Sequence, residues 1–226
     1  MSDGQAIDFQ TGLFAAGRAV TAPAMSPGRF TVLPEERFAA LRPAVEARLR
    51  EAAQEACAAG FDAVFDQAMR ALLVDEFARV GAHEGTVWLL DAQRESLVPR
   101  FNSGPHAEKF VDRFRQSLRS GMISMVVAME QPICENDVNK NAYQDPTLDQ
   151  ELELQTCAML AVPFLFVGEL RGVVSCVQLR RADSIEADPP GFGVEHLRAL
   201  QLKVGILSRL IEARLLALCL GMEALV

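Results

Sequence analysis

The stretch TCAMLAVPFLFVGELRGVVSCVQL, residues 156–179, decides the fold class of this chain. It contains two apolar runs, Thr156–Val167 and Leu170–Leu179, on either side of Gly168–Glu169. Glycine at the first central position of a two-residue turn is typical of a type II′ hairpin, so we predict two long antiparallel strands. Pro163 has no N–H to donate, so its nitrogen must face an edge, an end or a bulge of the sheet.

Weaker strand signals precede this hairpin. Thr86–Asp91 and Ser96–Phe101 are apolar and partly β-branched, and a polar turn joins them, which predicts a second hairpin. Residues 131–135 are a further short strand candidate, whereas residues 107–119 have the apolar spacing of a helix. We therefore expect an antiparallel sheet region over residues 85–180.

Helices are predicted before the sheet region. Apolar side chains recur at three- and four-residue steps through residues 34–80, and Pro34 is well placed as a first helical residue. Pro43 should kink or restart this helical region, and Gly60 should break it. Residues 1–33 have little periodicity and are expected to form a flexible segment.

A long helix is predicted after the sheet region, over residues 194–221. Helices that come before and after an antiparallel sheet region in the sequence define an α/β fold of the α+β type. We expect one domain over residues 34–226, because a chain of this length builds one good core and not two.

Composition excludes several classes of function. The chain has 226 residues, 22 basic and 30 acidic, which gives a net charge of 22 − 30 = −8 and argues against nucleic acid as a partner. The longest uncharged apolar stretch, Thr156–Gly168, is shorter than the roughly 20 residues of a membrane-spanning helix, and the N-terminus has no secretory signal. The five cysteines are widely spaced, so we expect reduced thiols in a cytoplasmic protein without a metal site.

Several short motifs resemble the GAF family of small sensory domains. The family pattern has a Pro-Ile-x-x-x-Asp unit, a Val-Pro strand, a glycine turn and a Gly-Val strand. In this chain the matching residues are Pro132, Ile133, Asp137, Val162, Pro163, Gly168, Gly172 and Val173. The resemblance implies a six-stranded antiparallel sheet with helices on one side and a small-molecule pocket on the other.

The resemblance also implies which loops face that pocket. A pocket needs a few convergent polar groups in an apolar lining. The candidate pocket residues are Arg100, Asn102, Ser103, His106, Cys134, Asn136, Asp137, Tyr143, Thr156 and Cys157. The alternative is that residues 102–105 form a simple turn and that His106 is a solvated residue at the start of a helix. The cofactor and the ligand are unknown from the sequence.

Two kinds of chemistry are alternatives to this interpretation. Asp137, Asn139, Asn141 and Asp145 match four positions of a calcium-binding loop, but Ala142 and Leu148 replace its glycine and its terminal acid. One GAF subfamily reduces free methionine sulfoxide with cysteines, but residues 123–124, which match its nucleophile, contain no thiol. Cys134 and Cys157 have no adjacent histidine or arginine in sequence to lower their pKa values. We therefore assign no catalytic residue and keep a thiol-based reductase as the alternative function.

The last helix predicts a homodimer. One of its faces has a heptad-like seam, which we assign to the dimer interface: Leu197, Leu200, Val204, Leu207, Ile211 and Leu218. A second apolar face contains Leu202, Ile206 and Leu210, and the first helix has a similar stripe through Phe38, Leu41, Val45 and Leu49. We therefore expect the N- and C-terminal helices of two copies to form a four-helix bundle. Arg214 should pair with Glu212 or with an acid of the second copy. The alternative is that the terminal helices pack on each other within one chain.

The sequence therefore predicts a non-catalytic GAF protein that senses a small molecule or regulates in signalling. It would act as a homodimer, with a signalling protein as a possible partner and no membrane or nucleic acid.

Overall fold

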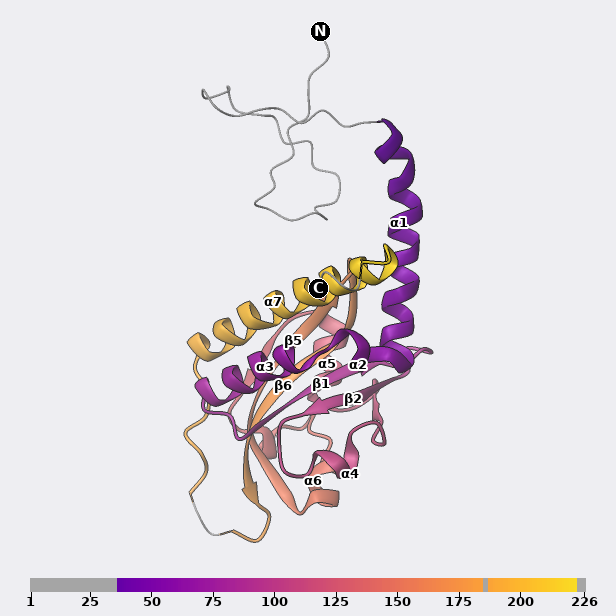
Figure 1. The fold of residues 1–226 in the computed structure, drawn as a ribbon. Helices are drawn as coiled ribbons and strands as arrows, with labels where there is room; N and C mark the ends of the chain where they lie inside the picture. The colour runs from indigo at the N-terminus through magenta and orange to yellow at the C-terminus, as the bar shows by residue number, and fades with distance from the viewer. Residues whose placement is uncertain (1–35, 185–186, 223–226) are drawn as a thin grey trace, which may run out of the picture. The chain divides into compact units, whose positions relative to one another are not determined.

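The computed structural model describes residues 36–184 and 187–222 (Figure 1). The chain divides into two compact units, Met1–Arg48 and Leu49–Val226. The predicted flexible segment, residues 1–33, lies outside the described residues, so that expectation and the domain boundary at residue 34 stay predictions. In the first unit, helix α1 (Glu36–Glu55) begins and continues through Pro43, and Arg42 pairs with Glu46 one turn later.

The second unit contains the sheet. Its strand order is β3-β2-β1-β6-β5-β4, and every neighbouring pair is antiparallel. The strands are β1 (Glu84–Leu90), β2 (Ser96–Asn102), β3 (Gln116–Ser117), β4 (Ile133–Glu135), β5 (Leu154–Phe166) and β6 (Glu169–Arg181). Both predicted hairpins are present, and the six-stranded antiparallel sheet with helices confirms the α+β fold class.

The turn between β5 and β6 differs from the prediction. Its central residues are Val167 and Gly168, and both have positive φ, 52° and 72°. Two positive φ values define a type I′ turn and not the expected type II′ turn. Valine rarely adopts this conformation. The Val167 N–H donates to Glu212 Oε1 at 2.7 Å, and this hydrogen bond to helix α7 stabilises the turn.

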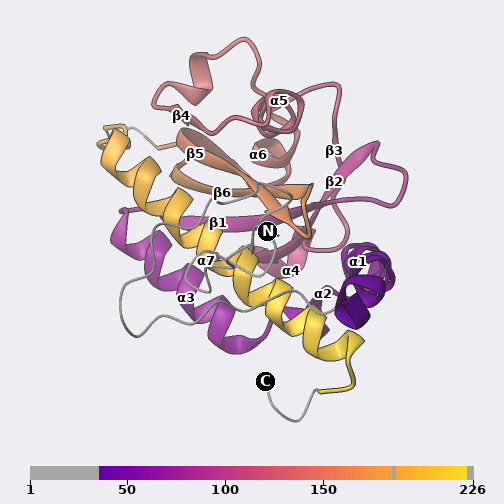
Figure 2. The ribbon, with the colours of Figure 1, turned by 90° about the horizontal axis from the view of Figure 1, so that it is seen from above.

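Helices α3 (Gln67–Arg79) and α7 (Val194–Cys219) cover one face of the sheet (Figure 2). Between α1 and α3 the chain forms a π turn (Ala56–Gly60) and a short helix, α2 (Phe61–Val64). Phe77 of α3 packs directly on Gly85 of β1, where an added Cβ would lie 2.4 Å from the phenyl ring. Lys203 of α7 also reaches the fully buried Glu76 of α3, with Nζ and Oε2 3.5 Å apart. This face of the sheet is closed by close packing.

Shorter elements cover the other face of the sheet (Figure 2). They are α5 (Met122–Met129), the 3₁₀ turn η2 (Val138–Lys140) and α6 (Thr147–Leu152). The short helix α4 (Ala107–Phe110) follows β2 and contacts that strand. Ile123 and Val126 of α5 pack on Trp88, Ala161 and Val173 of the sheet.

The predicted helix over residues 107–119 is wrong beyond Phe110. Asp112 has a φ of 61°, which ends helical geometry, and its N–H donates to the Pro99 carbonyl at 2.8 Å. The chain then reaches the sheet edge, where Gln116 and Ser117 pair with β2. Tertiary hydrogen bonding to the sheet therefore overrides the apolar spacing of this segment.

The assignment of faces on α7 also needs correction. Leu200, Val204, Leu207 and Ile211 are at most 2% exposed, because they face the sheet and α3. These residues of the predicted interface are thus core residues of one chain, while Leu197 is half-buried and Leu218 lies at the surface. The outward face contains Leu202, Ile206 and Leu210 instead. Arg214 pairs with Asp66, which precedes α3, rather than with Glu212.

Candidate functional site

A cavity of about 90 Å³ lies on the face of the sheet that α5, η2 and α6 cover. We call it the sheet cavity. Alternate residues of β1 and β6 point into it, namely Glu84, Thr86 and Trp88 from β1 and Ser175, Val177 and Leu179 from β6. Period-two alternation places these side chains on one face and Gly85 and Val87 on the other. The described residues that line the cavity include three carboxylates and no lysine, arginine or histidine.

The first carboxylate, Glu84, is only 7% exposed. Asn102 holds it in place, because its amide Nδ2 donates to Thr86 Oγ1 at 2.9 Å and to Glu84 Oε1 at 3.4 Å. Burial raises the pKa of Glu84, and the hydrogen bond from Asn102 only partly opposes this shift. Glu84 is therefore a desolvated acid with one weak protein donor.

The second carboxylate, Asp149, comes from α6. Its Oδ2 accepts the Thr156 N–H and its Oδ1 accepts the Thr156 hydroxyl, both at 2.8 Å. Burial nevertheless raises the pKa of Asp149. The charge of Asp149 also contributes to the raised pKa of Glu84, so the two acids interact across the cavity.

The third carboxylate, Asp145, is tied to its surroundings. It accepts hydrogen bonds from the Thr147 hydroxyl at 2.6 Å, from Gln116 Nε2 at 3.0 Å and from the Ser120 hydroxyl at 2.9 Å. These donors lower the pKa of Asp145 to about 2. Asp145 therefore fastens the loop before α6 to the start of α5 and stays ionised.

The base of the cavity is formed by Trp88 and Ser175. Trp88 Nε1 donates to Ser175 Oγ at 2.9 Å, and both residues are buried. This hydrogen bond fixes the indole plane against Phe114, at a centroid distance of 6.3 Å. The arrangement offers a rigid apolar surface with hydrogen-bond acceptors above it.

Of the ten residues predicted for the pocket, only Thr156 lines the sheet cavity. Asn102 does not line the sheet cavity, but it donates a hydrogen bond to Glu84, which does. Ser103 Oγ accepts the Gly85 N–H, and His106 lies close enough to lower the pKa of Glu84 through its charge. These residues support the site without lining it.

Arg100 has a structural role. Its Nη2 donates to the carbonyls of Cys57 and Ala58 at 3.0 and 2.6 Å, and its Nη1 donates to Asp112 at 2.8 Å. Arg100 therefore fastens the π turn to β2, and it does not reach the sheet cavity.

The remaining candidates lie away from the sheet cavity. Asn136 forms two hydrogen bonds with the backbone of Phe192. Asp137 forms an ion pair with Lys140 at the surface, and the Tyr143 side chain is 64% exposed. Asn141 donates to Glu135, so the side chains of the calcium-like loop turn to different partners. Among the described residues, no group of three or more histidines, cysteines or acids is placed to hold a metal ion.

The cysteines are separate from the sheet cavity as well. Cys134 is exposed, and its Sγ lies 3.5 Å from the Phe192 carbonyl; Cys157 is buried beside Asp188. Burial raises the pKa of both thiols, and neighbouring acids raise it further. These surroundings are opposite to those of a reactive thiolate, so the structure does not favour the thiol-reductase alternative.

Sequence reasoning did not assign Glu84, Asp145 or Asp149 to the pocket, and it considered Asp145 only as a calcium ligand. Glu84 precedes the strand that we predicted from Thr86, although the alternation of Glu84, Thr86 and Trp88 is a usable signal. Asp145 and Asp149 lie in a segment that reads as a solvated acidic loop. Only the fold shows that α6 brings Asp149 onto the sheet.

Comparison with known proteins identifies the family. The family profile described as the GAF domain matches residues 58–212, so this chain belongs to the GAF domain family. The GAF domain of an Acinetobacter phosphoenolpyruvate-protein phosphotransferase is 16% identical, with 79% of this chain and 97% of that chain covered and a TM-score of 0.53. The corresponding domain from Coxiella burnetii is 22% identical, with 78% and 96% covered and a TM-score of 0.53.

These structural likenesses show the fold alone, because the identities are low. No curated protein sequence matches the chain. Among the described helices, none combines the length and the apolar run that crossing a membrane requires.

Proposed function

We propose that this chain is a non-catalytic GAF protein that binds a small, cationic or donor-rich molecule in the sheet cavity and regulates a signalling partner. The observation that carries the proposal is the charge of the lining, three carboxylates without a basic side chain. Membership of the GAF family supports a sensory or regulatory role.

The chemistry of the acids defines the ligand class. Glu84 is buried and Asp149 is partly buried, and removal from water raises the pKa of each. An ammonium, amidinium or similar group between them would restore the lost solvation and stabilise both charges. A carboxylate or phosphate ligand would instead add a negative charge to a buried acidic site, which is unfavourable. The small volume limits the ligand to a compact molecule.

We also propose that the protein is a homodimer in the cytoplasm. The outward face of α7 presents Leu202, Ile206 and Leu210 at four-residue steps, and Leu202 is 68% exposed. A continuous apolar stripe of this kind is typical of an interaction surface. All five cysteines lie among the described residues and none forms a disulfide, which supports a reducing compartment.

Native mass spectrometry of freshly purified protein tests the ligand and the dimer together. We expect a dimer with a retained amine-like ligand, and loss of that ligand in Glu84→Gln/Asp149→Asn. Asp137→Asn is the matched control, because Asp137 is an exposed acid outside the cavity. A retained anionic ligand would overturn the ligand class. Methionine sulfoxide turnover that disappears in Cys134→Ala/Cys157→Ala would overturn the non-catalytic role.

Sedimentation equilibrium tests the dimer surface. We expect Leu202→Asp to produce a folded monomer, because a carboxylate buried in an apolar interface loses its solvation. Leu165→Asp serves as the control, since Leu165 is also an exposed leucine but lies at the end of β5. A wild-type monomer at micromolar concentration contradicts the dimer.

A further inference from the structure

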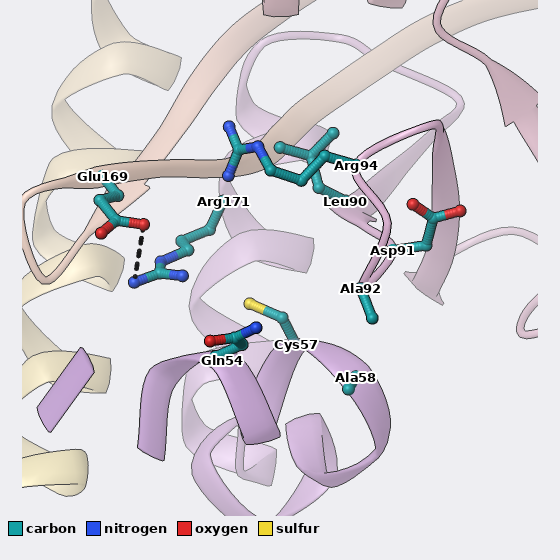
Figure 3. A pocket seen from close by; sticks show the side chains of 9 residues that line it. All are labelled: Gln54, Cys57, Ala58, Leu90, Asp91, Ala92, Arg94, Glu169 and Arg171. Atoms are coloured by element: carbon teal, nitrogen blue, oxygen red, sulfur yellow. Dashed lines mark ion pairs between the residues drawn. The ribbon is translucent and has the colours of Figure 1, made fainter. Parts of the chain in front are cut away.

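A second cavity, of about 130 Å³, lies away from the sheet cavity. Its walls are the last turn of α1 with the π turn, the β1–β2 turn, and the start of β6 (Figure 3). Gln54 and Cys57 come from the first wall, Arg94 from the second, and Glu169 and Arg171 from the third. We call this cavity the Arg171 pocket. π turns often mark functional positions in helices, which directs attention to this region.

Arg171 is the unusual residue of this pocket. It is 7% exposed, and its Nε and Nη2 atoms are buried and have no hydrogen-bond partner among the residues that the structure describes. The guanidinium lies over the Phe166 ring, 5.9 Å from its centroid, and this contact orients its plane. A buried charged donor without an acceptor costs free energy, so a native structure normally supplies an acceptor.

The two carboxylates near Arg171, those of Glu169 and Asp91, do not supply that acceptor. Glu169 Oε2 lies 3.2 Å from Nη2 and forms an ion pair with it, but the Glu169 side chain is half exposed and makes no hydrogen bond to Nη2 or Nε. The Asp91 carboxylate points away from Arg171 (Figure 3), and it accepts hydrogen bonds from Ser96 and the Glu95 N–H. Arg94 adds a second positive charge to the same cavity.

Cys57 does not supply the missing negative charge. Burial raises the pKa of its thiol to about 11, and the charges of Arg171, Arg100 and Arg94 oppose this shift only partly. The thiol is therefore neutral near pH 7. Three arginines nevertheless act on this sulfur, which indicates a positive potential in the pocket.

We propose that the Arg171 pocket binds a small oxyanion, a carboxylate or a phosphate group, along the Nε–Nη2 edge of Arg171. These two N–H groups are parallel, and such an edge matches two oxygens of a carboxylate or phosphate. Arg94 provides a second cation for the same anion. Glu169 competes with the ligand for Nη2 and weakens binding. This site is independent of the sheet cavity and selects the opposite charge.

Thermal-shift titration of the full chain with sodium phosphate and with sodium acetate tests the proposal, with sodium chloride at equal ionic strength as the reference. We expect a saturable rise in melting temperature with at least one of the two anions, and the stronger one identifies the ligand group. Arg171→Met should weaken this binding at least tenfold. Arg181→Met is the matched control, because Arg181 is an exposed arginine on the same strand.

Glu169→Gln is the sharper variant, since its half-exposed side chain can change without loss of the fold. Removal of the competing carboxylate should tighten anion binding several-fold. The bound anion should also slow the reaction of Cys57 with a small methanethiosulfonate reagent and leave the exposed Cys134 unaffected.

Three results would overturn the proposal. One is that neither the wild type nor Glu169→Gln distinguishes phosphate or acetate from chloride. Another is that folded Arg171→Met binds the anion as tightly as the wild type does. The third is that the anion protects Cys134 and Cys57 equally.

Discussion

The two faces of the sheet are built from the same strands and have opposite chemistry. On one face, Phe77 fills the space above Gly85, and Leu200 and Leu207 of α7 are fully buried. On the other face, Glu84 and Thr86 of β1, which alternate along the strand with Gly85 and Val87, point into the sheet cavity. The helical face holds the fold together, whereas the cavity face retains Glu84 and Asp149, whose pKa values are raised by burial.

The difference supports the sheet cavity as the site of the function that we propose. Buried carboxylates with raised pKa values cost folding free energy, and proteins retain such costs mainly at functional sites. The ion pairs of the helical face are different, because Arg79 and Lys203 accompany the buried Glu76. Glu84 forms no ion pair of this kind within residues 36–184 and 187–222, although His106 and His83 partly oppose the rise of its pKa. We therefore propose a ligand as its partner.

The largest effect is expected on the helical face. Leu207→Asp should lower the free energy of unfolding by more than about 4 kcal/mol, because Leu207 is 0% exposed and a lone carboxylate there has no partner. Urea unfolding followed by circular dichroism measures this loss. Leu202→Asp, on the outward face of the same helix, should leave the fold intact. If Leu207→Asp gives a stable monomer instead, Leu207 belongs to an interface and our description of the faces is wrong.

A smaller effect that depends on pH is expected for Asp145→Asn. The folded-state pKa of Asp145 is about 2, below its usual value of 3.8, so ionised Asp145 stabilises the folded state. This stabilisation is fully present above the unfolded pKa and is lost as pH falls through the folded pKa. We expect Asp145→Asn to cost about 1–2 kcal/mol at pH 6 and clearly less near pH 2, where half of the Asp145 carboxyls are protonated. Urea titrations at several pH values measure the difference, and a loss that is constant with pH would contradict it.

The opposite sign is expected for Glu84→Gln. The folded-state pKa of Glu84 is raised, so its contribution to stability is greatest in acid and is lost as pH rises through the folded pKa. Glu84→Gln should therefore raise the unfolding free energy by about 1 kcal/mol at neutral pH, and this gain should shrink in acid. Thermal unfolding at pH 4 and pH 7 measures it, with Asp137→Asn as an exposed control. Destabilisation at pH 7 would show that Glu84 is structural.

The smallest effect is expected from calcium. Asp137 pairs with Lys140, and Asp145 is occupied by Gln116, Ser120 and Thr147, so these side chains do not converge. A millimolar calcium titration should leave the melting temperature unchanged. A saturable rise of several degrees would mean that the acidic loop rearranges into a metal site.

The sequence predicted those elements that local signals encode. The hairpin over residues 156–179 and the long last helix are both present, because glycine turns and apolar periodicity act over a few residues. The predicted helix over residues 107–119 failed because a sheet edge competes for its backbone. The prediction assigned the inward face of α7 to the dimer interface. A helix with two apolar stripes does not reveal from its sequence which stripe packs on the sheet.

The sequence by itself therefore determined the antiparallel fold, the GAF family and the order of the elements. Only the tertiary structure decided which polar residues meet. Glu84 and Asp149 lie 149 − 84 = 65 positions apart in the sequence. They line the same cavity because α6, which contains Asp149, packs on the sheet that contains Glu84. Arg171 likewise meets Gln54 and Cys57 only through packing of the π turn. The reason is physical: strand and helix signals are local, whereas burial of a charge depends on every element that removes water from it.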